Sequence, residues 1–188
     1  MMGNRGILHD DDKKVVRNWV GKSWVACLPS FNGIDRRPLF WPGRYSELFF
    51  LDEAAAFAAG HRPCAYCQRN RFNEFKSFWQ LANSVNGSDT GFDVKRVDAV
   101  LHEDRAIRGG GKVTFTARLA SLPGGTFIES EGISALIHMG RLHRWSFTGY
   151  TRSEFEISDR HVKVLTPRSI VRLYEEGLEP RVHATAYA

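Results

Sequence analysis

Two cysteines separated by two residues, Cys64 and Cys67, are the side chains whose type and spacing best suit chemistry. Pro63 precedes them, and proline commonly occupies the first position of a helix, so we expect both thiols in the first turns of a helix. Helix positions three residues apart share a face, where two thiols can chelate one ion or form one disulfide. The pair therefore predicts a metal site or a redox-active dithiol.

A metal site of this kind needs further ligands, because structural zinc is held by four. The third cysteine, Cys27, lies in an apolar run typical of a strand, and His61 precedes Cys64 by three residues. Cys27, Cys64 and Cys67 with His61, or with His9 in its place, would form a Cys3His set that zinc accepts. The alternative is that Cys27 is a buried strand residue and the pair are reduced thiols.

The redox interpretation uses the same pair without a metal. At the N-terminus of a helix, a thiolate is stabilised by the helix dipole and by neighbouring cations, here Arg62 and Arg69. A thioredoxin-like motif is expected beside a strand–helix–strand unit, whereas this pair follows a helix. The redox dithiol is therefore kept as an alternative to the metal site.

The segment that leads to the pair has clear local signals. Residues 48–51 form an apolar run of strand length, Asp52 is a good helix N-cap, and residues 54–59 have high helix propensity. Gly60 stands where helices commonly end in the left-handed conformation. We expect a strand, a capped helix and a sharp break just before the thiols.

Patterns along the rest of the chain predict an α+β fold with an antiparallel β-rich part and a C-terminal helix. Apolar side chains recur at helical spacing in some segments, and β-rich runs bounded by turn residues indicate hairpins in others. The expected helices are residues 69–82, 92–107 and 168–176, and the expected strands include residues 133–137, 142–147 and 162–165. Residues 1–12 are expected to be irregular, and the polar stretch 83–91 to be a loop or boundary.

Composition places the chain in an ordinary globular class. Of its 188 residues, 43% are hydrophobic and 25% are charged, which is enough apolar material for a core. No apolar run has the length of an export signal or a membrane span, so we expect a cytoplasmic protein with no membrane partner. Three cysteines, an odd number, argue against a disulfide framework.

The net charge of +5 makes nucleic acid a plausible partner. Residues 35–45 interleave arginines with aromatic residues, a pattern that suits single-stranded nucleic acid because guanidinium groups neutralise phosphates while rings stack on bases. The alternative is a loop whose aromatic side chains cover the core. The candidate nucleic-acid-binding residues are Arg36, Arg37, Arg44, Arg62, Arg69 and Arg71.

Residues 24–70 resemble the N-terminal metal-binding domain of the Ada methylphosphotriester DNA-repair proteins. The resemblance rests on Ala59-Gly60-His61-Arg62-Pro63-Cys64-x-x-Cys67, which is similar to the family's A-G-[FY]-R-P-C-x-x-C. Upstream, Gly33, Ile34, Arg37 and Pro38 match the family's G-I-x-C-R-P-x-C. The resemblance implies a zinc-binding module that acts on DNA.

The chain departs from that family at two ligand positions. In the family, four cysteines hold one zinc, and the first of them accepts a methyl group from a DNA phosphotriester. Arg36 and Phe40 stand at the positions of the first two cysteines, and neither side chain ligates zinc. The expected function is therefore an Ada-like, nucleic-acid-associated protein without methyl-acceptor activity.

We expect an N-terminal segment at 1–19, an Ada-like module at 20–82 and a β-rich part with the C-terminal helix at 92–183. The last two could also form one compact domain. A different class of function stays open, namely an enzyme that acts on a small molecule from a pocket between the two parts.

Overall fold

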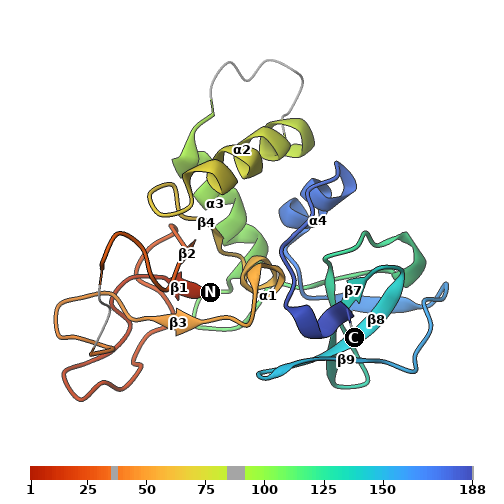
Figure 1. The fold of residues 1–188 in the computed structure, drawn as a ribbon, viewed down its shortest axis with the longest axis horizontal. Coiled ribbons are helices and arrows are strands. Elements are labelled where there is room, and N and C mark those ends of the chain that lie inside the picture. The colour runs from red at the N-terminus through yellow and green to blue at the C-terminus, as the bar shows by residue number, and fades with distance from the viewer. Residues whose placement is uncertain (35–37, 84–91, 188) are drawn as a thin grey trace.

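The computed structural model describes residues 1–34, 38–83 and 92–187, and it contains two sheets with helices between and above them (Figure 1). The smaller sheet comes from the N-terminal third of the chain, and the larger, antiparallel sheet from the C-terminal half. The predicted α+β class is confirmed. Of the helices in the described part, none has the length and apolar character needed to cross a bilayer.

The smaller sheet has the strand order β3-β1-β2-β4. β1 (Met2–Asn4) pairs antiparallel with β2 (Val25–Cys27) and with β3 (Leu48–Phe49), while β2 pairs parallel with β4 (Arg62–Pro63). The prediction that residues 1–12 are irregular is wrong in this respect, because β1 is an inner strand and Met2 is fully buried. Three residues are too few for sequence periodicity to reveal such a strand.

The segment before the cysteines forms as predicted up to Gly60. α1 (Glu53–Ala58) is capped by Asp52, whose side chain accepts a hydrogen bond from the Ala55 amide at 2.8 Å. Gly60 has a φ of 79°, the left-handed conformation in which helices commonly end.

The prediction that Pro63 opens a helix is wrong. The amides on either side of it, those of Arg62 and Cys64, donate to the carbonyls of Trp24, just before β2, and of Ala26 on β2. Pro63 needs no amide hydrogen in this ladder, and β4 is an edge strand, where proline is tolerated. The thiols therefore lie in a turn between β4 and the next helix.

Three longer helices share one hydrophobic core. α2 (Arg69–Asn83) and α3 (Val94–Arg105) confirm the first two predicted helices, and α4 (Arg168–Glu175) confirms the C-terminal one. The stretch 84–91 lies outside the described residues. The core residues are Phe57, Phe75, Trp79, Val97, Leu101, Ile170, Leu173, Tyr174 and Leu178. Because this core joins α4 to α1, α2 and α3, the regions 20–82 and 92–183 are not packed separately.

The larger sheet has the strand order β5-β10-β6-β7-β8-β9, and all of its pairs are antiparallel. It confirms the predicted hairpins. Its strands are β5 (Phe115–Arg118), β6 (Phe127–Ser130), β7 (Ile133–His138), β8 (Arg141–Ser146), β9 (Gly149–Arg152) and β10 (His161–Val164). Two short 3-10 helices, Leu119–Ser121 and Ala184–Tyr187, complete the described elements.

Candidate functional site

The fold brings all three cysteines together. The sulfur atoms of Cys27, Cys64 and Cys67 lie within 4.8 Å of one another, although Cys27 comes from β2 and the other two from the turn after β4. The parallel pairing of β2 with β4 is responsible, because it places Ala26 beside Pro63 and so brings the ends of both strands to one place. The three thiols form a candidate metal centre.

The geometry and protonation of this centre suit a thiophilic metal. Zinc holds its sulfur ligands at about 2.3 Å, which corresponds to about 3.8 Å between sulfurs in a tetrahedral site, so small side-chain rotations close the set around one ion. Hydrogen bonds from the Cys27 thiol and from the Tyr66 and Cys67 amides lower the pKa of Cys64 to about 5, although its partial burial opposes the shift. The Leu28 amide donates to the Cys67 sulfur at 3.3 Å.

The other two thiols hold their protons more tightly. The hydrogen bond that Cys27 donates to Cys64, together with burial, raises the pKa of Cys27, and burial raises the pKa of Cys67. The metal-free centre is therefore one thiolate supported by two thiols. A bound cation would displace the two remaining protons.

His61 does not join the cysteines. Its ring is fully buried, and its Nε2 accepts a hydrogen bond from the Arg5 Nε at 3.2 Å. Burial and the nearby charges of Arg5 and Arg105 hold the pKa of His61 well below its usual range. His9 is also occupied elsewhere, by a hydrogen bond to Ser46. Among the described residues, the group of metal-ligating side chains contains the three cysteines only.

The six arginines predicted to bind nucleic acid differ in their exposure to solvent. Arg36 and Arg37 lie outside the described residues, and Arg44 and Arg69 are exposed. Arg62 and Arg71, which lie near the cysteines in the sequence, are buried and form ion pairs.

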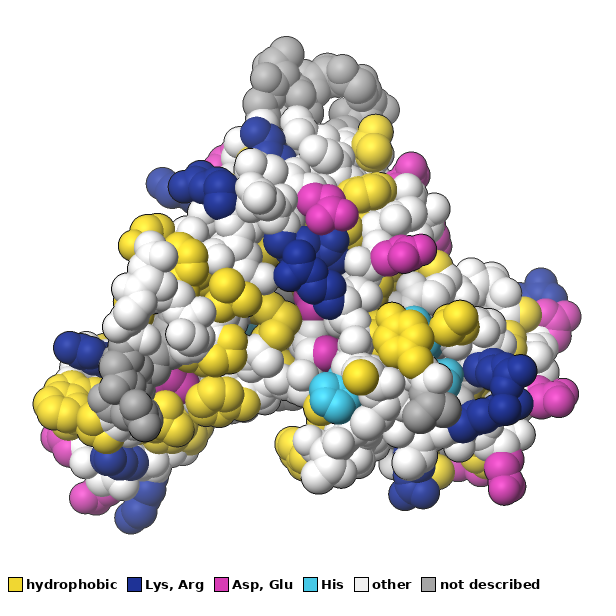
Figure 2. Space-filling model, in the orientation of Figure 1, with side chains coloured by type: hydrophobic (Ala, Val, Ile, Leu, Met, Phe, Trp, Pro, Cys, Tyr) yellow, Lys and Arg dark blue, Asp and Glu magenta, His cyan; other side chains and the backbone are white. Residues whose placement is uncertain are grey.

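Each buried arginine meets a carboxylate inside the protein. Arg62 binds Asp98 through two hydrogen bonds of 2.7 and 2.9 Å, and Arg71 binds Glu53 at 2.7 Å. Their guanidinium groups hold elements together and are not presented to phosphate. Figure 2 shows basic side chains spread over its face of the molecule among acidic ones, without a single basic stripe.

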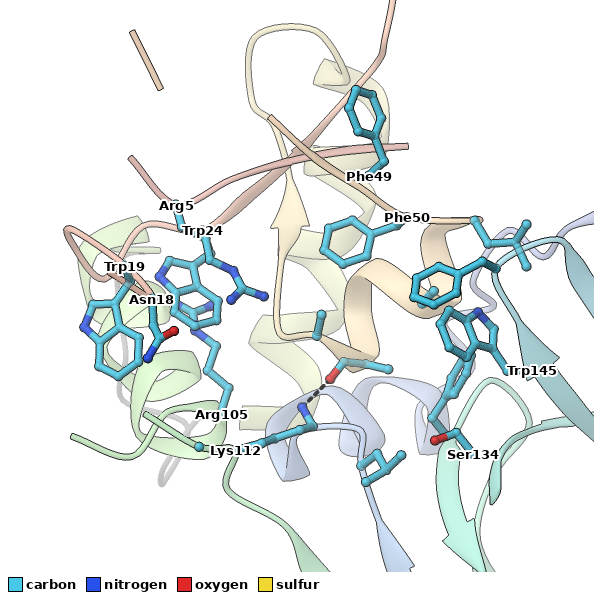
Figure 3. Close-up of a pocket in the computed structure, with 18 residues that line it drawn as sticks. Arg5, Asn18, Trp19, Trp24, Phe49, Phe50, Arg105, Lys112, Ser134 and Trp145 are labelled. Atoms are coloured by element: carbon cyan, nitrogen blue, oxygen red, sulfur yellow. Dashed lines mark hydrogen bonds between the residues drawn. The ribbon is translucent and has the colours of Figure 1, made fainter. Parts of the chain in front are cut away.

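A pocket of about 620 Å³ lies between the two sheets, and few of its residues belong to the predicted sites. Figure 3 shows Arg5, Trp24 and Arg105 on one side of it, Phe50 and Trp145 toward the other, and Lys112 reaching in between them. The residues come from β-strands, loops, α1 and the end of α3, far apart in the chain. No motif or spacing links them, so only the three-dimensional structure reveals the site.

No family model, curated protein or solved structure matches this chain. The Ada-like resemblance of residues 24–70 therefore stays a prediction, and the cysteine cluster and the pocket are the features that point to a function.

Proposed function

We propose that this chain is a zinc-binding protein in which Cys27, Cys64 and Cys67 hold the ion. The observation that carries the proposal is the convergence of the only three cysteines of the sequence, from two separate segments, to within 4.8 Å. Thiolates are the preferred ligands of structural zinc, and one of the three already favours the thiolate form.

The three cysteines would leave the fourth position of a tetrahedral ion to water, so this site would lack the closed four-ligand set of a structural zinc but would still tie elements of the fold together. It would link the end of β2 to the turn before α2, and so fasten the smaller sheet to the helical core. Bound zinc supplies a positive charge that keeps all three sulfurs deprotonated and protects them from oxidation. Methyl transfer is not part of the proposal, because Arg36 and Phe40 occupy the positions at which the Ada-like resemblance places two of its four thiolates.

Elemental analysis of the purified chain by mass spectrometry tests the proposal. We expect about one zinc per chain and its loss in each of Cys27→Ser, Cys64→Ser and Cys67→Ser. His161→Asn removes an exposed metal-capable side chain on β10 and is the control that should retain the ion.

Two results would count against zinc. Protein that stays free of zinc when purified with the metal present, with its three cysteines reduced, would contradict the metal centre. Metal-free protein with a disulfide between Cys64 and Cys67 would favour the redox alternative, for which the lowered pKa of Cys64 is the supporting observation.

We further propose nucleic acid as a partner of this zinc-binding chain. The supporting observations are the net charge of +5 and the exposure of Arg44 and Arg69. The salt dependence of binding, argued in the Discussion, tests this part separately from the metal.

A further inference from the structure

Three cations line the pocket without a carboxylate at ion-pair distance, although the charge of Asp98 acts on Arg105 from farther away. In the described part of the chain, no acidic side chain lies within 4.0 Å of the charged groups of Arg5, Arg105 or Lys112. Arg62 and Arg71, which are buried like Arg105, each have such a partner. Arg105, which is buried, and Arg5 and Lys112, which are half-buried, differ from them in this respect.

The hydrogen bonds of these cations leave donors unused. The Arg105 guanidinium donates to the carbonyls of Gly60 and Lys22, so it contributes mainly charge. Lys112 donates to the Ala58 carbonyl at 2.6 Å, as Figure 3 shows, which leaves two of its three hydrogens. Arg5 uses its Nε on His61 and has its terminal nitrogens left. Arg5 and Lys112 are thus able to bind an anion directly.

The grouping of like charges is costly without an anion. Burial, with the neighbouring charges of Arg5 and Arg105 as smaller causes, lowers the pKa of Lys112 to about 8. Burial likewise lowers the pKa of Arg105 to about 9 and that of Arg5 to about 10. A ligand with more than one negative charge would relieve this repulsion, and a phosphate monoester carries nearly two at neutral pH.

Aromatic rings supply the rest of the pocket. Trp24 lies between two of the cations, since the guanidinium carbons of Arg5 and Arg105 are each 4.0 Å from its ring centre. At the edge of the pocket, Phe49 and Phe147 are 59% and 87% exposed. Aromatic side chains that stay exposed at the mouth of a pocket suit a planar ring as ligand.

We propose that this pocket binds a nucleoside phosphate, with the phosphate at Arg5 and Lys112 and the base against the aromatic residues of the opposite wall. The cavity of about 620 Å³ is within the usual range for ligands of this size. A free mononucleotide and a nucleotide unit of single-stranded nucleic acid share this chemistry. The site is independent of the metal centre, because none of the three cysteines lines the pocket.

Isothermal titration calorimetry of the intact protein tests the proposal with adenosine monophosphate, adenosine, inorganic phosphate and a single-stranded oligonucleotide of about ten nucleotides. We expect the mononucleotide to bind at least about tenfold more tightly than adenosine or phosphate alone, since it engages both walls. If only the oligonucleotide binds, and Lys112→Gln weakens it, the ligand is a nucleotide unit of nucleic acid.

Two pairs of matched variants locate the ligand. Lys112→Gln should weaken mononucleotide binding about tenfold, whereas Lys95→Gln, an exposed position at the other end of α3 from Arg105, should leave it unchanged. Phe147→Ser should weaken binding of the mononucleotide but not of phosphate, and Leu81→Ser, at another exposed apolar position on α2, should weaken neither.

Three results would overturn the proposal. The first is no binding of the mononucleotide or the oligonucleotide. The second is phosphate alone binding as tightly as the mononucleotide, which would leave no role for the ring. The third is equal loss of affinity in Lys112→Gln and Lys95→Gln, which would place the anion outside the pocket.

Discussion

Arg62 and Asp98 form a buried ion pair between β4 and α3, with Nε to Oδ1 at 2.7 Å and Nη2 to Oδ2 at 2.9 Å. Their side chains are only 7% and 8% exposed. Because Arg62 is two residues before Cys64, the pair anchors the cysteine turn to α3. An arginine whose sequence context indicates nucleic-acid binding is thus a structural residue beside the cysteine cluster.

Removing the acid of this pair should destabilise the fold strongly. Asp98→Ala leaves the Arg62 charge buried without a partner, so we expect the free energy of unfolding to fall by about 3–5 kcal/mol. Asp159→Ala breaks the exposed Arg118–Asp159 pair and should cost less than about 1 kcal/mol. Urea denaturation followed by circular dichroism measures both, and equal losses would show that the buried pair has no special role.

Gly60 should tolerate no side chain. Its φ of 79° disfavours other residues, and a Cβ there would overlap the Cδ of Arg105. Gly60→Ala should therefore lower the free energy of unfolding by about 2–4 kcal/mol. Gly33→Ala is the control, since Gly33 has a φ of 69° with open space around it and should cost only about 1–2 kcal/mol. Thermal melts measure both variants. Equal midpoints for Gly60→Ala and Gly33→Ala would contradict a steric overlap at Gly60.

Local signals in the sequence predicted those elements that depend on local interactions. The Asp52 cap, the left-handed Gly60 and the amphipathic helix α2 each arise from residues within one or two turns of each other. The prediction that Pro63 opens a helix failed because the strand conformation of Pro63 depends on pairing with β2, more than thirty residues earlier. The same distant pairing joins Cys27 to the other thiols.

Burial decides the rest of the site, and sequence alone does not show burial of a charged residue. Arg62 and Arg71 lie in a stretch of the sequence that suggests a basic surface. They are buried because they pair with Asp98 and Glu53, which are 36 and 18 residues away in the chain. The pocket cations Arg5 and Lys112 also come from distant segments with no shared motif.

In the metal-free protein, Cys64 should be the most reactive thiol. Hydrogen bonds lower its pKa to about 5, so its thiolate, and with it the rate of alkylation, should be nearly constant from about pH 6 upward. Cys27→Ala removes the main hydrogen-bond donor and should move the midpoint to higher pH. Iodoacetamide labelling after zinc chelation, read by peptide mass spectrometry, measures this, and preferential labelling of Cys67 would contradict it.

Binding to single-stranded nucleic acid should weaken as salt increases. Each phosphate neutralised contributes about 0.7 to the slope of log K against log salt concentration, so Arg44→Gln with Arg69→Gln should reduce the slope by up to about 1.4. Fluorescence anisotropy between about 50 and 200 mM salt gives the slope. Lys95→Gln with Lys163→Gln is the charge-matched control. The absence of detectable binding at the lowest salt concentration would rule out nucleic acid as a partner.

The affinity of the pocket for adenosine monophosphate should fall as pH rises through the pKa of Lys112. That pKa is lowered to about 8 by burial and by Arg5 and Arg105, while the buried His61 nearby stays neutral. A bound phosphate stabilises the charged lysine, so binding takes up a proton above about pH 8 and is favoured below it. The second ionisation of the phosphate, near pH 6, is already complete and cannot cause a decline in this range.

We expect affinity to decrease between about pH 7 and 8.5, by at most tenfold per pH unit, and Lys112→Gln to flatten the profile in that window. A profile that keeps its slope in Lys112→Gln would assign the titration to another group and remove Lys112 from the phosphate site.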